Sequence, residues 1–232
     1  MNPFHLQMLL NDRASFNRWR ARNLQEVVDL EGADLSYKDL RGSDLRRANL
    51  KGATLTGTLL EDVDLTSAVL EGAYLFRTRM RRANLTGAVL ERAFCQGADL
   101  TAARMYCARL DNADLRGARL CGANARQASF LKANLADADF TRARCKDACF
   151  DKANLAGANF EAANIDGLDL RAFVHVDLSK ALHMDVIFAP MRSNESWLGR
   201  FMRFLLAPFR PAQASMVSYA TPAPRRRERI AA

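Results

Sequence analysis

Histidine and cysteine, the side chains most often used for nucleophilic or metal chemistry, are few and scattered in this chain of 232 residues. The three histidines, His5, His175 and His183, lie toward the two ends of the sequence. A Ser/His/Asp triad, a Cys/His pair or a histidine-rich metal site needs such side chains beside their partners. The sequence also lacks the Gly-x-x-x-x-Gly-Lys-Ser/Thr pattern of a phosphate-binding loop. We therefore expect no catalytic site, no cofactor and no metal ion.

The dominant pattern is a repeat of five residues that runs without a gap from Leu30 to Leu170. Its central position is apolar throughout: 19 of 29 such residues are Leu, and none is charged. The residue two before the centre is Ala in 22 of the 29 units, and the residue just before it is often Asp or Asn. A helix or a strand would rotate the centre off its face within two units. Each unit therefore needs a turn.

Short sides that end in turns close into coils, and the coils must stack so that their backbone groups find partners. Glycine recurs two residues after the centre, as at Gly32 and Gly72, where a tight turn leaves least room for a side chain. The units, Ala-Asp/Asn-Leu-x-x over residues 28–172, resemble the pentapeptide-repeat family. The resemblance implies an all-β solenoid, a right-handed quadrilateral β-helix with four units in each coil.

The open ends of such a stack expose apolar core and unpaired backbone, so we expect short helical caps at both ends. Residues 1–27 are predicted to form the N-terminal cap. Within it, residues 3–22 read as one helix with Leu9, Phe16 and Trp19 along one stripe.

At the other end the repeat changes phase. We expect the β-helix to cover residues 28–190 with a register slip at 173–175, which makes about seven to eight coils. A capping loop followed by irregular chain is the alternative. Residues 191–207 are predicted to form an amphipathic helix, and residues 208–232, which are rich in Pro, Ala and Arg, a disordered basic tail.

The five cysteines divide by their place in the repeat. Cys95 and Cys145 are centres, whereas Cys107, Cys121 and Cys149 fall at outward or turn positions. No Cys-x-x-Cys pair occurs. This spacing predicts reduced thiols rather than a metal site.

The net charge of +8 is carried mostly outside the repeat. Residues 28–172 hold 21 Lys/Arg and 20 Asp/Glu, a net charge of +1. Some proteins of the family that these residues resemble are thought to shield type II topoisomerases with an acidic, duplex-like surface, and such mimicry needs a strongly negative rod. A gyrase- or topoisomerase-binding protector, a DNA mimic, is therefore an alternative rather than our first expectation.

No apolar run approaches the length needed to cross a bilayer, and no secretion signal follows Met1. We therefore expect a cytoplasmic protein. A membrane-surface or exported effector is a further alternative.

Outward aromatic residues interrupt the polar surface of the repeat. Tyr74 and Phe94 occupy equivalent positions one coil apart, Phe76 lies beside Tyr74, and Val69 and Val89 replace the usual Asp or Asn on the adjoining face. These five residues form one predicted patch, either a stabilising ladder or a surface that binds a partner. Four arginines are expected to form its rim: Arg77, Arg79, Arg81 and Arg82.

Two charged stripes follow from unrolling the coils. We interpret both as a solvated surface of mixed charge. The acidic stripe contains Glu31, Glu71, Glu91, Asp111 and Asp151, and the basic one contains Arg46, Arg104, Arg126, Arg144 and Lys146.

The predicted C-terminal helix carries an apolar face that includes Trp197, Phe201, Phe204 and Leu205. This face could cap the stack, form a homodimer or bind an anionic membrane surface. The basic tail could make weak, nonspecific contact with nucleic acid or anionic lipid. Taken together, the sequence favours a bacterial, non-enzymatic scaffold for protein–protein interaction, with a partner that it does not identify.

Overall fold

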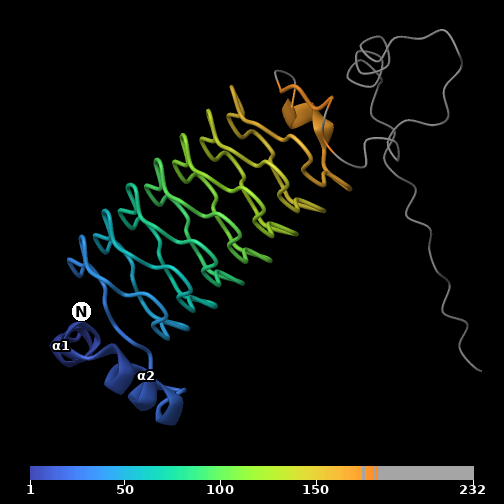
Figure 1. Ribbon diagram of the computed structural model, residues 1–232. Coiled ribbons are helices and arrows are strands. Elements are labelled where there is room, and N and C mark those ends of the chain that lie inside the picture. The colour runs from blue at the N-terminus through green and yellow to red at the C-terminus, as the bar shows by residue number, and fades with distance from the viewer. Residues whose placement is uncertain (174–175, 180, 182–232) are drawn as a thin grey trace, which may run out of the picture. The chain divides into compact units, whose positions relative to one another are not determined.

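The computed structural model describes residues 1–173, 176–179 and 181, all within one compact unit, Met1–Pro190. Its regular elements are the helices α1 (Pro3–Asn11) and α2 (Arg13–Arg22) and the short 3-10 helix η1 (Leu170–Phe173). Between α2 and η1 the chain winds as a stack of similar coils (Figure 1). In the described part of the chain, no helix is long and apolar enough to span a membrane.

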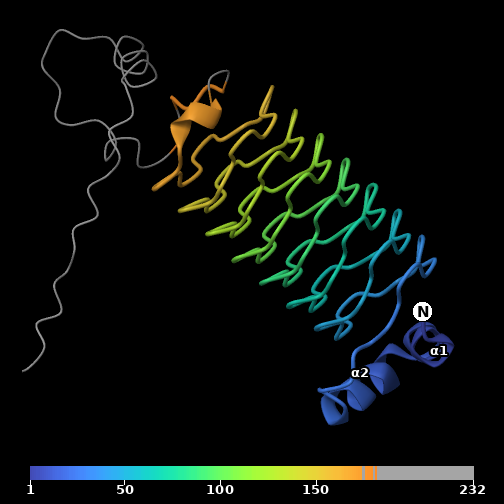
Figure 2. The same cartoon turned by 180° about the vertical axis from the view of Figure 1, so that it is seen from behind.

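Each coil takes twenty residues, because parallel β-bridges join every bridge residue to the one twenty positions later, from Asp29↔Asn49 to Arg144↔Asn164. The β-pairing between coils consists of isolated bridges, and residues 1–173 contain no extended β-strand. The backbone hydrogen bonds alternate in direction: Leu30 N–H donates to the Asn49 carbonyl (2.8 Å), and Asn49 N–H donates to the Val28 carbonyl (2.9 Å). The same coils are seen from behind in Figure 2. Stacking thus pairs groups that one coil could not satisfy.

Every unit ends in a turn of one kind, as the period of five predicts. The second residue after each centre from residue 32 to residue 167 has a positive φ, whether it is Gly32 (64°) or Arg47 (57°). The turn is closed by a bond such as Ala33 N–H to the Leu30 carbonyl (3.0 Å). Glycine adopts this left-handed conformation without strain, which explains its recurrence there.

Because the same turn recurs from unit to unit, it also explains why Asp or Asn often precedes the centre. Its side-chain oxygen accepts a hydrogen bond from the backbone N–H two residues later, as Asp34 does from Ser36 (3.0 Å). Such side-chain bonds favour turns. The Ala and Leu positions fill the interior: Ala48, Leu50 and Leu115 are fully buried. Turn chemistry and core packing therefore agree in the units that carry Asp or Asn before the centre.

The N-terminal cap is two helices rather than the single helix predicted over residues 3–22. The helical conformation is interrupted at Asp12, whose backbone is extended. The Asp12 side chain is the N-cap of α2 and accepts a hydrogen bond from Ala14 N–H (2.9 Å). The hydrogen bond from this N-cap stabilises the start of a second helix, so the first helix does not continue through Asp12. Leu9 and Phe16 are nevertheless buried, and Trp19 packs against the same core.

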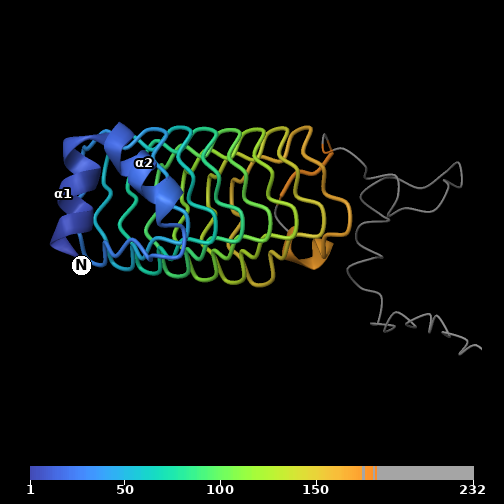
Figure 3. The ribbon, with the colours of Figure 1, turned by 90° about the horizontal axis from the view of Figure 1, so that it is seen from below.

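Helix α2 is fixed to the first coil by polar contacts. The Asn17 side chain donates to the Gly42 carbonyl (2.9 Å) and accepts from Asp44 N–H (2.9 Å). The buried guanidinium of Arg20 donates to the Arg46 carbonyl (2.9 Å). Figure 3 shows both helices against the N-terminal end of the stack. The cap therefore satisfies carbonyls that an open coil would leave without partners.

At the other end, η1 interrupts the repeat. Phe173 and Leu178, five residues apart, are both buried, and Ala181 N–H donates to the Leu178 carbonyl (3.0 Å) as in a regular unit. The shift of phase thus begins within η1. Residues 174–175 of the predicted slip, the helix 191–207 and the tail 208–232 lie outside the described residues.

Candidate interaction surface

The outward side chains of each unit are the residue before the centre and the residue after it. The two point to the same face, since Thr86 Oγ1 donates to Asn84 Oδ1 (2.7 Å) and Arg116 Nε donates to Asp114 Oδ1 (2.9 Å). Turns separate the four faces of the stack. Each face therefore presents two columns of side chains along its length.

One face carries an aromatic pair in an otherwise polar column. Tyr74 and Phe94 are joined by a parallel bridge, and their rings stack with centroids 5.1 Å apart and planes at 8°. Both rings remain exposed, Tyr74 at 49% and Phe94 at 42%. Neighbouring coils hold the two rings in register, so the pair is a rigid apolar surface.

Phe76 extends this surface. It is the residue after the centre in the coil of Tyr74, and its ring is 42% exposed. The guanidinium carbon of Arg77 lies 5.0 Å from the centroid of the Phe76 ring. This cation–π contact covers part of the ring and places a positive charge beside it.

The aromatic residues occupy positions that stabilise the turn in other coils of the same face. Asp114, Asn134 and Asn154 each accept a hydrogen bond from the backbone N–H two residues later, at 3.2–3.3 Å. Tyr74 and Phe94 have no side-chain oxygen in reach of that N–H. Each such bond contributes about 0.5–1.5 kcal/mol. The two units that carry Tyr74 and Phe94 therefore lack a hydrogen bond that stabilises the turn in other units of this face.

Val69 and Val89 lie on the preceding face, where a parallel bridge joins them and where both are half-buried. The turn between the two faces is charged: Glu71 binds Arg92 (3.6 Å) and Lys51 (3.2 Å). The five residues of the predicted patch thus fall on two faces with ion pairs at the edge between them. The apolar surface proper is the aromatic part: Tyr74, Phe76 and Phe94.

Three of the four predicted rim arginines are neutralised within the chain. Each pairs with an acidic residue of a neighbouring coil: Arg79 with Glu61 (2.9 Å), Arg81 with Asp99 (2.6 Å) and Arg82 with Asp62 (2.6 Å). The hydrogen bond from Arg82 lowers the pKa of Asp62. Arg77 has no ion pair in the described part of the chain. It is the one rim arginine whose charge is available to a partner.

The cysteines differ in burial and hence in reactivity. Burial raises the pKa of the thiols of Cys95 and Cys145 to about 12, which makes both unreactive. Cys107 and Cys149 are exposed and Cys121 is half-buried, and all five cysteines are free. Among residues 1–173, 176–179 and 181, no cluster of His, Cys, Asp and Glu could hold a metal ion.

Within the coils, two exposed aromatic residues were not predicted from the sequence. Tyr37 is 77% exposed and packs against Gly57 one coil later, where an added Cβ would lie 2.7 Å from its ring. Tyr106 is 42% exposed and stands in the same place in its unit as Phe76. That shared position, directly after a centre, is the signal that would have found Tyr106.

The family model described as pentapeptide repeats matches the chain in eight copies. The matched stretches adjoin or overlap and together span the whole repeat: residues 28–62, 43–82, 78–117, 118–155 and 138–172. No curated protein matches the chain.

Several solved structures are similar to it. QnrB1, a plasmid-mediated fluoroquinolone resistance protein, is 18% identical, with 60% of this chain and 80% of that one covered and a TM-score of 0.36. HetL, a pentapeptide repeat protein involved in heterocyst differentiation regulation in the cyanobacterium Nostoc sp. strain PCC 7120, is 30% identical, with 62% and 83% covered and a TM-score of 0.22. Rfr23, a pentapeptide repeat protein of the cyanobacterium Cyanothece 51142, is 21% identical, with 65% and 97% covered and a TM-score of 0.19.

Proposed function

We propose that this chain, which belongs to the pentapeptide-repeat family, is a non-enzymatic scaffold that binds another protein. Members of the family form right-handed quadrilateral β-helices, and here about seven to eight coils would carry the binding surface. The observation that supports this function is the exposed stack of Tyr74 and Phe94, with Phe76 beside it.

Two properties of the stack favour binding over a purely stabilising role. The rings are held by the coils before any partner arrives, so little conformational entropy is lost on association. Tyr74 and Phe94 also forgo the turn hydrogen bonds that Asp and Asn make on the same face. A ladder that served stability alone would not need to give these up.

The surroundings of the stack indicate the chemistry of the partner. Along the face, Gln96 Nε2 donates to Asp114 Oδ2 (2.8 Å), and this polar contact marks one end of the apolar surface. Arg77 supplies the one unpaired positive charge at its edge among the described residues. We therefore expect a protein segment that offers an apolar side chain with an acidic residue close to it.

A variant that restores the polar repeat tests the proposal. Tyr74→Asn, Phe76→Thr and Phe94→Asn in one chain should fold normally, because the two new Asn side chains can form the turn hydrogen bonds. Aromatic residues at the centre of an interface contribute about 2 kcal/mol or more each, so partner capture should be lost. The control is Tyr37→Asn, which removes an exposed aromatic residue elsewhere. Equal recovery of the same partners by both variants would contradict the proposal.

A supercoiling assay separates this function from topoisomerase protection. We expect no rescue of gyrase from a quinolone and no competition with DNA, because residues 28–172 carry a net charge of only +1. Dose-dependent rescue at low micromolar protein would favour the DNA-mimic alternative.

We also propose where the protein acts in the cell and how two copies associate. The protein would act in the cytoplasm, and two copies would join through the apolar residues Trp197, Phe201, Phe204 and Leu205, which lie outside the described residues. Deletion of residues 191–232 should then leave a folded monomer in sedimentation. Aggregation of the truncated chain would assign these residues a capping role, and binding of the full chain to anionic vesicles a membrane role.

A further inference from the structure

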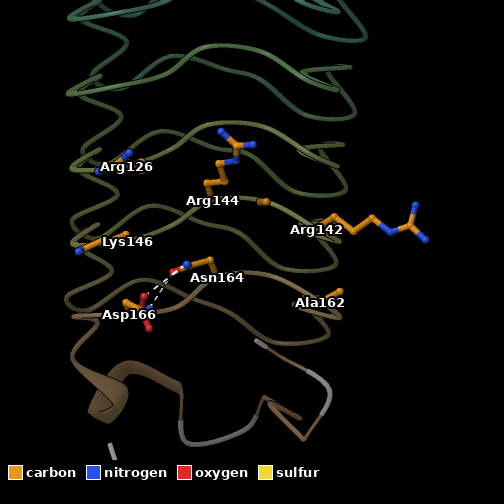
Figure 4. A pocket seen from close by; sticks show the side chains of 8 residues that line it. Arg126, Arg142, Arg144, Lys146, Ala162, Asn164 and Asp166 are labelled. Carbon is orange, nitrogen blue, oxygen red and sulfur yellow. Dashed lines mark hydrogen bonds between the residues drawn. The ribbon is translucent and has the colours of Figure 1, made fainter. Parts of the chain in front are cut away.

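A hollow of about 730 Å³ lies on the face that carries the basic stripe, near the last regular coils. Its lining includes Arg126, Arg142, Arg144, Lys146, Asn164 and Asp166. In Figure 4, Arg144 stands in the middle of the face, Arg126 and Lys146 lie along one edge, and Arg142 extends from the other edge away from them. Three of the cationic side chains that line the hollow, those of Arg126, Arg144 and Lys146, therefore lie in the part of the face away from Arg142.

These cations have no carboxylate partner among the described residues. In the described part of the chain, none of Arg126, Arg144 and Lys146 takes part in an ion pair. The hollow also contains one carboxylate, which bonds to its neighbour in the lining: Asp166 Oδ2 accepts from Asn164 Nδ2 (3.3 Å), and Asp166 N–H donates to Asn164 Oδ1 (3.1 Å). The other carboxylate oxygen, Asp166 Oδ1, has no hydrogen-bond partner among the described residues. On the same face nearer the N-terminus, by contrast, Arg46 binds Asp44.

The repeat places the three charges close together. Arg126 and Lys146 are equivalent residues of successive coils, and coils stack about 4.8 Å apart. Arg144 and Lys146 flank one buried centre, Cys145, and so point to the same face. Like charges at this spacing repel one another, and a bound anion relieves the repulsion.

The basic stripe is short. Toward the C-terminus, the position equivalent to Lys146 is Asp166. Toward the N-terminus, the unpaired cations of the stripe end at Arg104, which lies two coils before Arg144. The positions before it are Asn84 and Asp64, and Arg46, the remaining member of the stripe, is paired with Asp44. Two coil spacings are about 10 Å. A single nucleic-acid strand of that length carries about three phosphates, at about 3.4 Å each along the axis. The stripe therefore matches a compact anion rather than a long backbone.

We propose that this hollow binds a small ligand with two or three linked phosphate groups, through Arg126, Arg144 and Lys146. Arginine suits such a ligand because its guanidinium donates paired hydrogen bonds to phosphate oxygens. Two sources share this chemistry, a free polyphosphate and a nucleotide. Tyr106 would favour a nucleotide. It is exposed and occupies the position equivalent to Arg126 in the preceding coil, where its ring could stack on a base.

Titration calorimetry with tripolyphosphate, in magnesium-free buffer at low ionic strength, tests the site. Replacing Arg126→Gln and Arg144→Gln together should weaken binding about tenfold or more. The matched control, Arg119→Gln with Lys132→Gln, removes two unpaired charges outside the hollow and should change the Kd less than about twofold. Equal losses in the two variants, or no binding by the unmodified protein, would overturn the proposal. Circular dichroism melting verifies that both variants fold.

The same titration with ATP and with a single-stranded oligonucleotide identifies the source. Tighter binding of ATP than of tripolyphosphate, with the difference removed by Tyr106→Ala, would support a nucleotide. Equal binding of the two would support recognition of the phosphate chain alone. An oligonucleotide that binds more tightly than both would overturn the assignment of a compact ligand.

Discussion

Two stretches of the coil stack, residues 28–116 and residues 117–168, share one backbone and differ in core and surface. The centres of the first are mostly Leu, whereas four centres of the second are Phe, with rings stacked in pairs such as Phe140 and Phe160 (centroids 4.7 Å apart). Small centres in the second stretch, Ala125 and Cys145, offset the added volume. The fold therefore constrains the total volume of the core more than any single residue in it.

The surfaces differ in how their charges are paired. In the first stretch, eight of the eleven arginines bind carboxylates of the same or the neighbouring coil, as Arg82 binds Asp62 (2.6 Å) and Arg116 binds Asp114 (2.7 Å). Within the described residues, the exceptions are Arg47, Arg77 and Arg104. The seven Lys and Arg residues of the second stretch form no ion pair within the part of the chain that the structure describes. Outward positions are free to vary because the turn and the core already specify the coil. Function can therefore differ along a uniform scaffold.

The largest effect should come from a charge placed inward where the two stretches meet. Leu115 is fully buried, so Leu115→Asp leaves a carboxylate without a partner in the core and should abolish folding. Arg119→Asp, an outward change in the next unit, should be tolerated. Circular dichroism and thermal melting measure both. Equal stability of the two variants would mean that the register of inward and outward residues is wrong.

A smaller effect is expected at low pH, and it should arise in the first stretch. The hydrogen bond from Arg41 lowers the pKa of Asp39 to about 2, and that from Arg116 lowers the pKa of Asp114. A carboxyl group with a lowered pKa stabilises the fold above its unfolded value of about 3.9, and this contribution is lost as the pH falls toward about 2. The free energy of unfolding should therefore decrease over that range.

Chemical denaturation at several pH values checks this prediction. Arg41→Gln should flatten the pH dependence, because it removes the main partner of Asp39. Arg119→Gln, which removes an unpaired charge, should leave the dependence unchanged. An unaltered slope in Arg41→Gln would show that the paired carboxylates do not control acid stability.

The smallest effects should distinguish paired from unpaired arginines. Arg82→Gln breaks an exposed ion pair and should lower the stability of the protein slightly, and less so at high salt, because salt screens exposed charges. Arg142→Gln, in the second stretch, should change stability by less than about 0.5 kcal/mol. Denaturant titrations at low and high salt measure the difference. A salt-dependent loss in Arg142→Gln as large as that in Arg82→Gln would remove the contrast between the stretches.

The coil could be predicted from the sequence because every unit has the same two requirements, an apolar centre and a turn. The break at Asp12 was missed because one capping side chain decided it. The pairing of the rim arginines was missed because the partners are distant in sequence. Arg79 and Glu61 are 18 residues apart and Arg82 and Asp62 are 20 apart, so a search at one coil spacing would have found them.

The candidate sites were less predictable than the coil. The register of the repeat identified the outward aromatic residues, but the charged turn between Val69 and Tyr74 follows from the ion pairs of Glu71, which depend on long side chains. The basic stripe was interpreted as a surface of mixed charge. Only the lack of carboxylate partners near Arg126 and Arg144 sets it apart, and that depends on three-dimensional contacts.

The central claim is that Tyr74, Phe76 and Phe94 contact a protein partner, and site-specific photo-crosslinking tests it most directly. A photo-reactive phenylalanine in place of Phe76 should yield one discrete adduct in cells, which Tyr74→Asn with Phe94→Asn abolishes. The same group in place of Tyr37, a more exposed aromatic position than Phe76, should not yield that adduct. Identical adducts from both positions, or an adduct at Phe76 that survives loss of the stack, would contradict the claim.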